Sequence, residues 1–247
     1  MSGGEESLVV ANYWRIPVFP AYRRGGDFGV PQNDVKVLFM NFKEQREQMV
    51  EEQLMARGIE NEDVLEAFRA VPREEFVPES KKQLAYQDSP LQIGQGQTIS
   101  QPYTVARMTE LLDPKPVDKV LEVGTGSGYQ AAILAEIVEK VVTIERLRDL
   151  AESARNILGR LGYDNVQFII ADGSKGWEED APYDGIIITA AAKDLPQSLF
   201  DQLAVGGRLV APVGSRLVQE MIRVTKTEDG LKRESFGSFR FVPLIKS

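Results

Sequence analysis

Three glycines at alternate positions, Gly124, Gly126 and Gly128, mark the stretch of the chain with the clearest chemical meaning. An apolar run enters this stretch and a helical pattern leaves it, which predicts a strand, a glycine-rich loop and a helix. Because glycine has no Cβ, the loop can adopt positive φ angles and lie against a bound group. The spacing differs from the G-x-G-x-x-G of dinucleotide sites. It favours a nucleoside whose sugar and amino-acid tail cross the loop; the alternatives are a variant dinucleotide loop and a turn without a ligand.

Acidic residues follow the next two predicted strands. Glu145 ends the β-branched run 141–144, and Asp172-Gly173 follows the run 166–170. An acidic residue about 20 positions after a glycine loop commonly binds ribose hydroxyls, because an ionised carboxylate accepts two hydrogen bonds. Both acids could instead be solvated loop residues or helix caps. Glu122, just before the loop, could bond loop N–H groups and also support the ligand.

Residues 93–102 form an unusual segment that carries small and amide side chains and that we expect to be flexible. Pro102 fits the first position of a helix over 102–112, so Ser100 lies at a helix N-terminus. Its hydroxyl could cap that helix, or it could hydrogen-bond an anion held at the helix end.

The composition excludes several kinds of site. The chain has 247 residues without any cysteine or histidine, which excludes disulfides and thiolate chemistry and removes the usual metal ligand and general base. A formal net charge of −8 disfavours a nucleic-acid surface. No apolar run approaches a membrane span, and no hydrophobic segment follows the acidic N-terminus as in a secretory signal. We therefore expect a cytoplasmic enzyme without a metal, a nucleic-acid partner or a membrane, and nothing in the sequence requires more than a monomer.

From Asp118 onward, predicted strands alternate with predicted helices. The strands are 118–123, 141–145, 166–170, 183–189 and 207–212, and the helices are 128–138, 147–161 and 196–204. This alternation predicts an α/β fold, a doubly wound, mostly parallel sheet of the Rossmann-like kind, with ligands beyond the carboxyl ends of the strands. Gly124, Glu145, Asp172 and the segment 189–192 all fall at that edge. Residues 219–227 and 231–245 predict a closing antiparallel hairpin.

The N-terminal part divides into two regions. Residues 1–39 cluster aromatic side chains without periodicity; they could be an extension packed through its aromatics, a partner-binding tail, or a segment before a true start at Met40. Helical patterns over 42–58 and 61–71 predict a packed cap. We therefore expect an extension at 1–39, a helical substrate-side region at 40–115 and a ligand-binding core at 116–247.

The motifs resemble those of class I S-adenosylmethionine-dependent methyltransferases. The segments 94–102, 122–130, 189–192 and 241–244 narrow the resemblance to the protein-L-isoaspartate O-methyltransferase family, from about Met40 to the C-terminus. The run Gly-Gln-Thr-Ile-Ser, 96–100, is the most specific piece, because general methyltransferases lack it. Many members have histidine where this chain has Gln92 and Tyr103, which removes any histidine role there.

This resemblance implies methyl transfer from S-adenosyl-L-methionine to the free carboxylate of L-isoaspartyl residues in damaged proteins and peptides, giving a methyl ester and S-adenosyl-L-homocysteine. Ser100 matches the active-site serine of the family. The positions that match cofactor contacts are Gln97, Thr98 and Ile99 beside cofactor and substrate; Glu122, Gly124, Gly126 and Gly128 at the loop; Glu145 at the ribose; Asp172 and Gly173 at the adenine end; and Gln219 late in the chain.

The residue types agree with this chemistry. A carboxylate has a pKa of about 4 and is already a nucleophile at neutral pH, so methyl transfer to it needs no general base. Three other functions stay open on the residues: a methyltransferase for another acceptor, an S-adenosylmethionine-binding module without turnover, and a nicotinamide-dependent oxidoreductase. The Gly-Gln-Thr-Ile-Ser segment argues against another acceptor, and the presence of Ser100 argues against a module without turnover. The spacing of the glycines argues against a nicotinamide-dependent enzyme.

Overall fold

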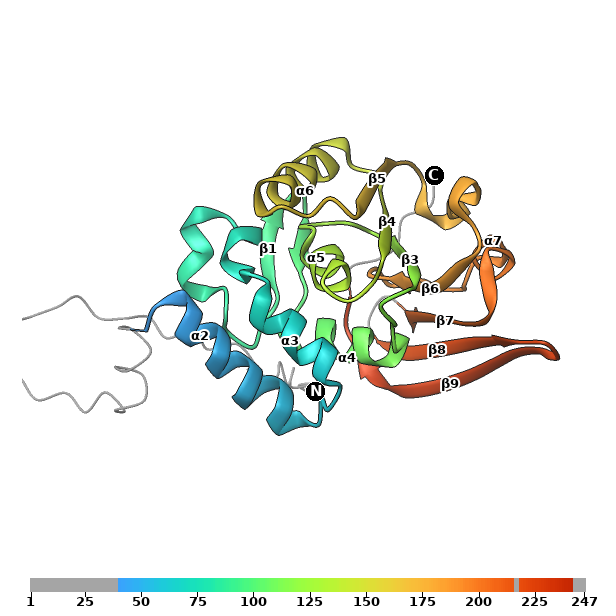
Figure 1. The fold of residues 1–247 in the computed structure, drawn as a ribbon, viewed down its shortest axis with the longest axis horizontal. Helices are drawn as coiled ribbons and strands as arrows, with labels where there is room; N and C mark the ends of the chain where they lie inside the picture. The colour runs from blue at the N-terminus through green and yellow to red at the C-terminus, as the bar shows by residue number, and fades with distance from the viewer. Residues whose placement is uncertain (1–39, 216–217, 242–247) are drawn as a thin grey trace, which may run out of the picture. The chain divides into compact units, whose positions relative to one another are not determined.

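The structure, a computed structural model, describes residues 40–215 and 218–241 (Figure 1). The chain divides into two compact units, Met1–Phe39 and Met40–Ser247, and all the described residues belong to the second. The three interpretations of residues 1–39 and the predicted strand residues 242–245 lie outside the described residues.

Two helical segments begin the described chain. Helix α2, Phe42–Met49, starts at a capping box in which Asn41 and Glu44 exchange side-chain and backbone hydrogen bonds. It continues as a π-helical turn, Val50–Leu54, and a 3-10 turn, Met55–Arg57, and ends at Gly58 with a φ of 84°. Helix α3, Glu62–Ala70, is capped by Asn61, as its sequence predicts.

Most of the segment expected to be flexible lies in a β-hairpin, which the sequence did not indicate. Strand β1, Leu91–Gly94, pairs antiparallel with strand β2, Gln97–Ile99, around the turn at Gln95 and Gly96. Leu91 and Ile99 face each other and are both buried. These two buried apolar residues hold the base of the hairpin in place, and the tip is polar. Strands of three and four residues are too short to be detected from the sequence pattern. Helix α4, Pro102–Leu112, follows directly.

A seven-stranded sheet forms the centre of this unit, in the order β5-β4-β3-β6-β7-β8-β9. Its strands are β3 (Lys119–Val123), β4 (Lys140–Glu145), β5 (Val166–Ile170), β6 (Tyr183–Ile188), β7 (Leu203–Gly214), β8 (Gln219–Thr227) and β9 (Gly230–Phe239). The first five are parallel, and β8 and β9 add antiparallel strands at one edge. The predicted fold class is confirmed. The chain order reverses between β3 and β6, which is where open α/β sheets bind ligands.

Helices cover both faces of the sheet. Side chains alternate between the two faces along each strand, so the strands contribute buried apolar residues to a core on each face. Val120 and Val141 pack with helices α3, α4 and α5 (Tyr129–Ala135) and with Leu158 of α6 (Arg148–Leu161). Their neighbours Leu121 and Val142 pack on the opposite face with α7, Gln197–Asp201. Short 3-10 turns at Gly173–Lys175 and Glu178–Asp180 connect β5 to β6.

Several predicted boundaries need correction. The helix predicted over 196–204 ends at Asp201, because Leu203 is buried and already pairs with Tyr183 in the sheet. The helix predicted over 128–138 ends at Ala135. Strand β9 ends at Phe239 rather than running on through the described residues 240 and 241.

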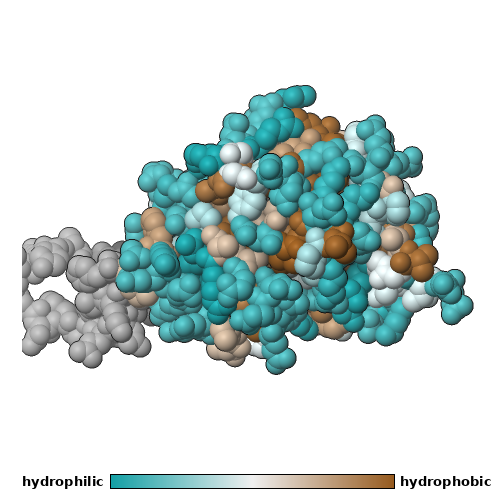
Figure 2. All heavy atoms as spheres, in the orientation of Figure 1, coloured by the Kyte–Doolittle hydropathy of each residue, from teal (hydrophilic) through white to brown (hydrophobic). Residues whose placement is uncertain are grey.

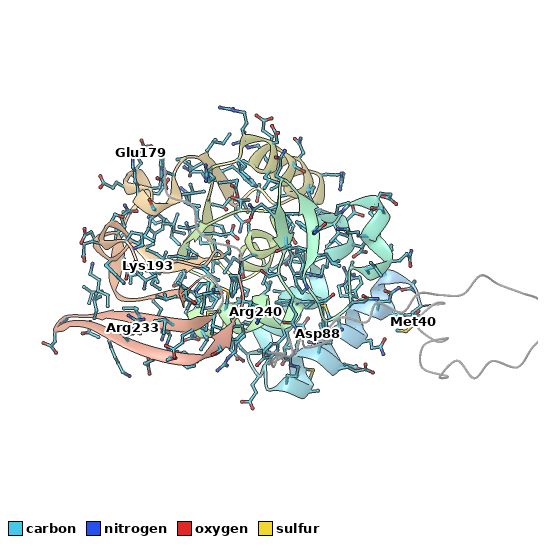
Figure 3. The ribbon with its side chains drawn as sticks, turned by 180° about the vertical axis from the view of Figure 1, so that it is seen from behind. Met40, Asp88, Glu179, Lys193, Arg233 and Arg240 are labelled. Atoms are coloured by element: carbon cyan, nitrogen blue, oxygen red, sulfur yellow. The ribbon has the colours of Figure 1, made fainter. Side chains whose placement is uncertain are left out.

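The β8–β9 hairpin extends past the other strands in Figure 1. Seen from behind in Figure 3, Arg233 lies out along this hairpin and Arg240 lies near its base. The face shown in Figure 2 is mostly hydrophilic, in keeping with the 27% of charged residues in the chain. In the part of the chain that the structure describes, no helix is both long and apolar enough to cross a membrane.

Candidate active site

A cavity of about 300 Å³ lies at the carboxyl edge of the parallel strands. The ends of β3 and β4, the glycine loop, the β1–β2 hairpin and the start of α4 supply its walls. The structure brings together at this cavity most of the site residues predicted from the sequence: Gln97, Thr98, Ile99, Ser100, Glu122, Gly124, Gly126, Glu145 and Gly173. Gly128, Asp172 and Gln219 do not line it.

A side chain would not fit at two glycines of the loop, for a different reason at each. Gly124 has a φ of 103°, and a Cβ there would lie 2.5 Å from Oγ1 of Thr189. That Thr189 hydroxyl donates to the carbonyl of Gly124 at 2.6 Å, which joins the loop to the end of β6. Gly128 has a φ of 88°, and a Cβ there would lie 2.7 Å from Cδ1 of Leu158 and 3.0 Å from Cβ of Ala154. Gly124 therefore shapes the cavity wall, and Gly128 lets α5 start close against α6.

Glu145 binds the glycine loop from the end of β4. Its Oε2 accepts from the backbone N–H of Gly126 at 3.0 Å, and its Oε1 accepts from that of Leu147 at 2.9 Å. A carboxylate has about four acceptor positions, so both oxygens can still accept from a ligand hydroxyl. Glu145 is buried and lines the cavity.

Glu122 has a different environment from the predicted one. It bonds no loop N–H group; the hydroxyl of Thr143 donates to its Oε2, and the hydroxyls of Thr143 and Thr125 lie 2.6 Å apart. Its Oε1 is buried without a hydrogen-bond partner among the described residues. Burial raises the pKa of Glu122 to about 8, the Thr143 hydrogen bond lowers it, and the nearby Glu145 raises it further. Thr143 is polar within an apolar run, which was the available sequence signal for this pair.

Asp172 and Gly173, which were predicted together at the adenine end of the cofactor, have different positions in the structure. Gly173 lines the cavity. Asp172 caps the following 3-10 turn by accepting from the N–H of Ser174 at 3.0 Å, so the helix-cap alternative describes this contact.

Gln219 lies behind the cavity wall. Its Nε2 donates to the carbonyl of Ser215, and its Oε1 accepts from the N–H of Phe241 at 2.9 Å. Phe241 itself lines the cavity. Gln219 is 1% exposed, so it reaches the site through the Phe241 backbone.

Ser100 lies between β2 and α4 and lines the cavity. The N-cap of α4 is Gln101, and no side-chain hydrogen bond caps the helix, so Ser100 is not a capping hydroxyl. Its backbone carbonyl accepts from Nη2 of Arg73 at 2.8 Å, a contact that the sequence did not suggest. Nearby, Tyr103 lies under the guanidinium of Arg57, whose Cζ is 3.6 Å from the ring centroid.

Oε1 of Glu122 and the two oxygens of Glu145 are acceptors for a ligand with a cationic group and hydroxyls. Gly126 leaves space beside them, because a Cβ there would meet only Cδ1 of Ile93, at 4.0 Å. They fit S-adenosyl-L-methionine, which carries an ammonium group, a ribose and an adenine. Within residues 40–215 and 218–241, no three acidic side chains gather in a way that could hold a metal ion.

The family pattern described as protein-L-isoaspartate(D-aspartate) O-methyltransferase matches residues 44–247. A protein-L-isoaspartate O-methyltransferase of Geobacter metallireducens is 55% identical over 207 residues, which cover 83% of this chain and 96% of that protein. One of Methanoculleus marisnigri is 52% identical over 203 residues, which cover 82% and 92%.

Solved structures agree with these sequence relatives. One protein-L-isoaspartate O-methyltransferase has a TM-score of 0.73 and 32% identity, over 80% of this chain and 65% of that one. A second, described as such an enzyme from Plasmodium falciparum in complex with S-adenosyl-L-homocysteine, has a TM-score of 0.70 and 28% identity, over 84% of this chain and 100% of that one. This chain belongs to the protein-L-isoaspartate(D-aspartate) O-methyltransferase family.

Proposed function

We propose that this chain is a protein-repair methyltransferase in which Ser100 orients the substrate carboxylate. It transfers a methyl group from S-adenosyl-L-methionine to the free carboxylate of L-isoaspartyl residues in damaged proteins and peptides. The observation that supports this most directly is that Ser100 and Glu122 line one cavity, and that Oε1 of Glu122 has no hydrogen-bond partner among the described residues. One residue would meet the acceptor and the other the cofactor.

The cofactor would be held mainly by the glycine loop and two carboxylates. Glu122 offers its free oxygen to the ammonium group, and Glu145 offers its oxygens to the ribose. Gly124 and Gly126 line the cavity, and Gly126 leaves room for the part of the cofactor between those two groups. Gln97, Thr98 and Ile99 close the cavity on the substrate side, and Gly173 lines the adenine end. In this proposal Gly128, Asp172 and Gln219 support those contacts from outside the cavity.

When bound, S-adenosyl-L-methionine supplies a methyl group on a positively charged sulfur, an electrophile that needs no acid catalyst. The acceptor carboxylate is ionised at neutral pH, so no residue has to remove a proton. The Ser100 hydroxyl donates a hydrogen bond to one carboxylate oxygen and so directs the other toward the methyl carbon. Ile99, Val105 and Met108 give the cavity an apolar side that excludes water. The protein contributes mainly by aligning the carboxylate oxygen with the methyl group, and such alignment can lower the activation barrier by several kcal/mol.

The first experiment measures labelled methyl transfer to two peptides that differ at one residue, L-isoaspartate or L-aspartate. We expect strong labelling of the isoaspartyl peptide alone, and a large fall in turnover for Ser100→Ala with little change in S-adenosyl-L-homocysteine affinity. Equal labelling of both peptides would contradict the selectivity. Wild-type turnover of Ser100→Ala would contradict the role of the serine and leave the reaction standing.

We also propose that the chain acts as a monomer in the cytoplasm, without nucleic acid or membrane partners. The net charge of −8 and the absence of cysteine support this. Residues 40–115 would form the substrate side and 116–247 the cofactor-binding core, with 1–39 as an extension. Light scattering tests the monomer, cell fractionation tests the location, and a chain starting at Met40 tests whether the extension is needed for methylation.

A further inference from the structure

Arg73 is a buried arginine outside the cavity. It begins the 3-10 turn Arg73–Phe76 after α3, and its side chain is 0% exposed. Its Nε donates to the carbonyl of Ala85 at 2.7 Å, and its Nη2 donates to the carbonyl of Ser100 at 2.8 Å. One guanidinium therefore joins three segments that are distant in the sequence, and one of them carries the proposed catalytic hydroxyl.

The charge of Arg73 is not neutralised by an ion pair among the described residues. The neighbouring carboxylate, Glu74, accepts instead from the hydroxyl of Tyr86. The guanidinium lies over the ring of Tyr129, 4.8 Å from its centroid, and its Nη1 has no hydrogen-bond partner in the described part of the chain. A buried cation without a carboxylate is costly, so a role for it in the fold alone would favour an apolar replacement.

Both groups that Arg73 meets on the cavity side belong to the site. Ser100 lines the cavity, and Tyr129 lines it as the first residue of α5, directly after Gly128. The guanidinium thus holds the serine segment against the helix that starts at the cofactor loop. A hydrogen bond to the Ser100 carbonyl fixes the peptide plane there, and with it the direction in which the side chain leaves the backbone.

We propose that Arg73 is a positioning residue for Ser100: by fixing the Ser100 carbonyl it aims the hydroxyl at the substrate carboxylate. The inference rests on the proposed function of Ser100. Lysine would keep the charge but not the planar fork, so one ammonium could not hold the Ala85 and Ser100 carbonyls in the same geometry.

The test is a double-mutant cycle of Arg73→Lys and Ser100→Ala, with kcat measured on the isoaspartyl peptide. We expect Arg73→Lys to lower kcat about tenfold or more in the wild-type background and less than about twofold in the Ser100→Ala background. The affinity for S-adenosyl-L-homocysteine, measured by calorimetry, should change by less than about threefold, because the cofactor carboxylates are untouched. Arg208→Lys is the matched control: Arg208 pairs with Asp113 away from the cavity, and its kcat should not change.

An equal loss of kcat in both backgrounds would overturn the proposal, since it would mean that Arg73 supports the fold in general. Failure of both Arg73→Lys and Arg73→Gln to fold would overturn it for the same reason. Hydrogen exchange gives a readout without turnover: amides of residues 97–104 should exchange faster in Arg73→Lys, and those of β3 and β4 should not. Wild-type turnover of Ser100→Ala marks failure of the proposed role of Ser100, on which this inference rests, whereas an impaired Ser100→Ala with additive effects marks failure of this inference alone.

Discussion

The hydroxyl of Thr143 donates a hydrogen bond of 2.5 Å to one oxygen of Glu122, and the other oxygen of that carboxylate is buried without a partner among residues 40–215 and 218–241. The Glu122 side chain is 0% exposed and stands in the wall of the cavity. Loss of hydration disfavours its charged form and raises its pKa to about 8. Because the chain has no histidine, few other side chains change charge near neutral pH.

Ligand binding should release a proton from Glu122. In the free protein at pH 7 a carboxyl with a pKa of about 8 is mostly protonated. The ammonium group of S-adenosyl-L-homocysteine beside it would favour the carboxylate, so affinity should rise with pH up to about 8. Calorimetry at pH 7 in two buffers with different ionisation enthalpies should give release of nearly one proton, and Glu122→Gln should abolish it. A binding enthalpy independent of the buffer would rule this out.

Glu122 should also make the free protein less stable as pH rises. Its folded pKa lies above its unfolded value, so folding favours the protonated form. The stability it contributes is complete below about pH 4, and it is lost as pH rises toward 8. Glu122→Gln does not ionise, so between pH 5 and pH 8 its free energy of unfolding should rise relative to that of the wild type by on the order of a few kcal/mol. Melting temperatures of the two proteins across this pH range measure the change.

The slope with pH decides this prediction, because any unpaired amide left by the glutamine gives a constant offset. Glu60→Gln, on the surface, controls for the loss of one negative charge. A constant difference between Glu122→Gln and the wild type across this pH range would contradict the raised pKa.

Gly128→Ala should destabilise the protein. Alanine is strained at a φ of 88°, and its Cβ would lie 2.7 Å from Leu158 and 3.0 Å from Ala154. We expect a loss of about 2 kcal/mol or more in urea denaturation, from strain and overpacking together. Gly159→Ala, within α6 and with nothing within 4 Å of the added Cβ, should instead stabilise by about 0.5–1 kcal/mol. Similar effects of the two changes would show that α5 and α6 can separate without cost.

Thr189→Val should weaken cofactor binding, and Thr189→Ser should not. The hydroxyl donates to the carbonyls of Gly124 at 2.6 Å and Val123 at 3.1 Å, and valine keeps the shape of threonine without the donor. Loss of a hydrogen bond that holds the loop should cost about 1 kcal/mol, which is a several-fold weaker affinity. Calorimetry with S-adenosyl-L-homocysteine measures this. Equal affinities of the valine and serine variants would mean that the loop keeps its shape without Thr189.

The parallel core was predictable because its signals are local. Each strand from β3 to β6 is a short β-branched or apolar run bounded by turn residues, and the predicted bounds agree with the observed ones within two residues. The end of α7 was not predictable, because the sequence does not tell a helix from a strand at Leu203. The pairing of Leu203 with Tyr183 across the sheet decides it.

The sequence by itself indicated the family and the fold class, and most of the site residues that it predicted line the cavity, because Gly124, Glu145 and Ser100 lie in motifs whose spacing is local. Tertiary structure alone decided how each residue takes part. It joined Glu122 to Thr143, placed Gln219 behind Phe241, and brought Arg73 to the carbonyl of Ser100. These partners are separated by 21 to 27 positions in the chain. A hydrogen bond depends on distance and direction in space, and only the folded sheet and its helices set those.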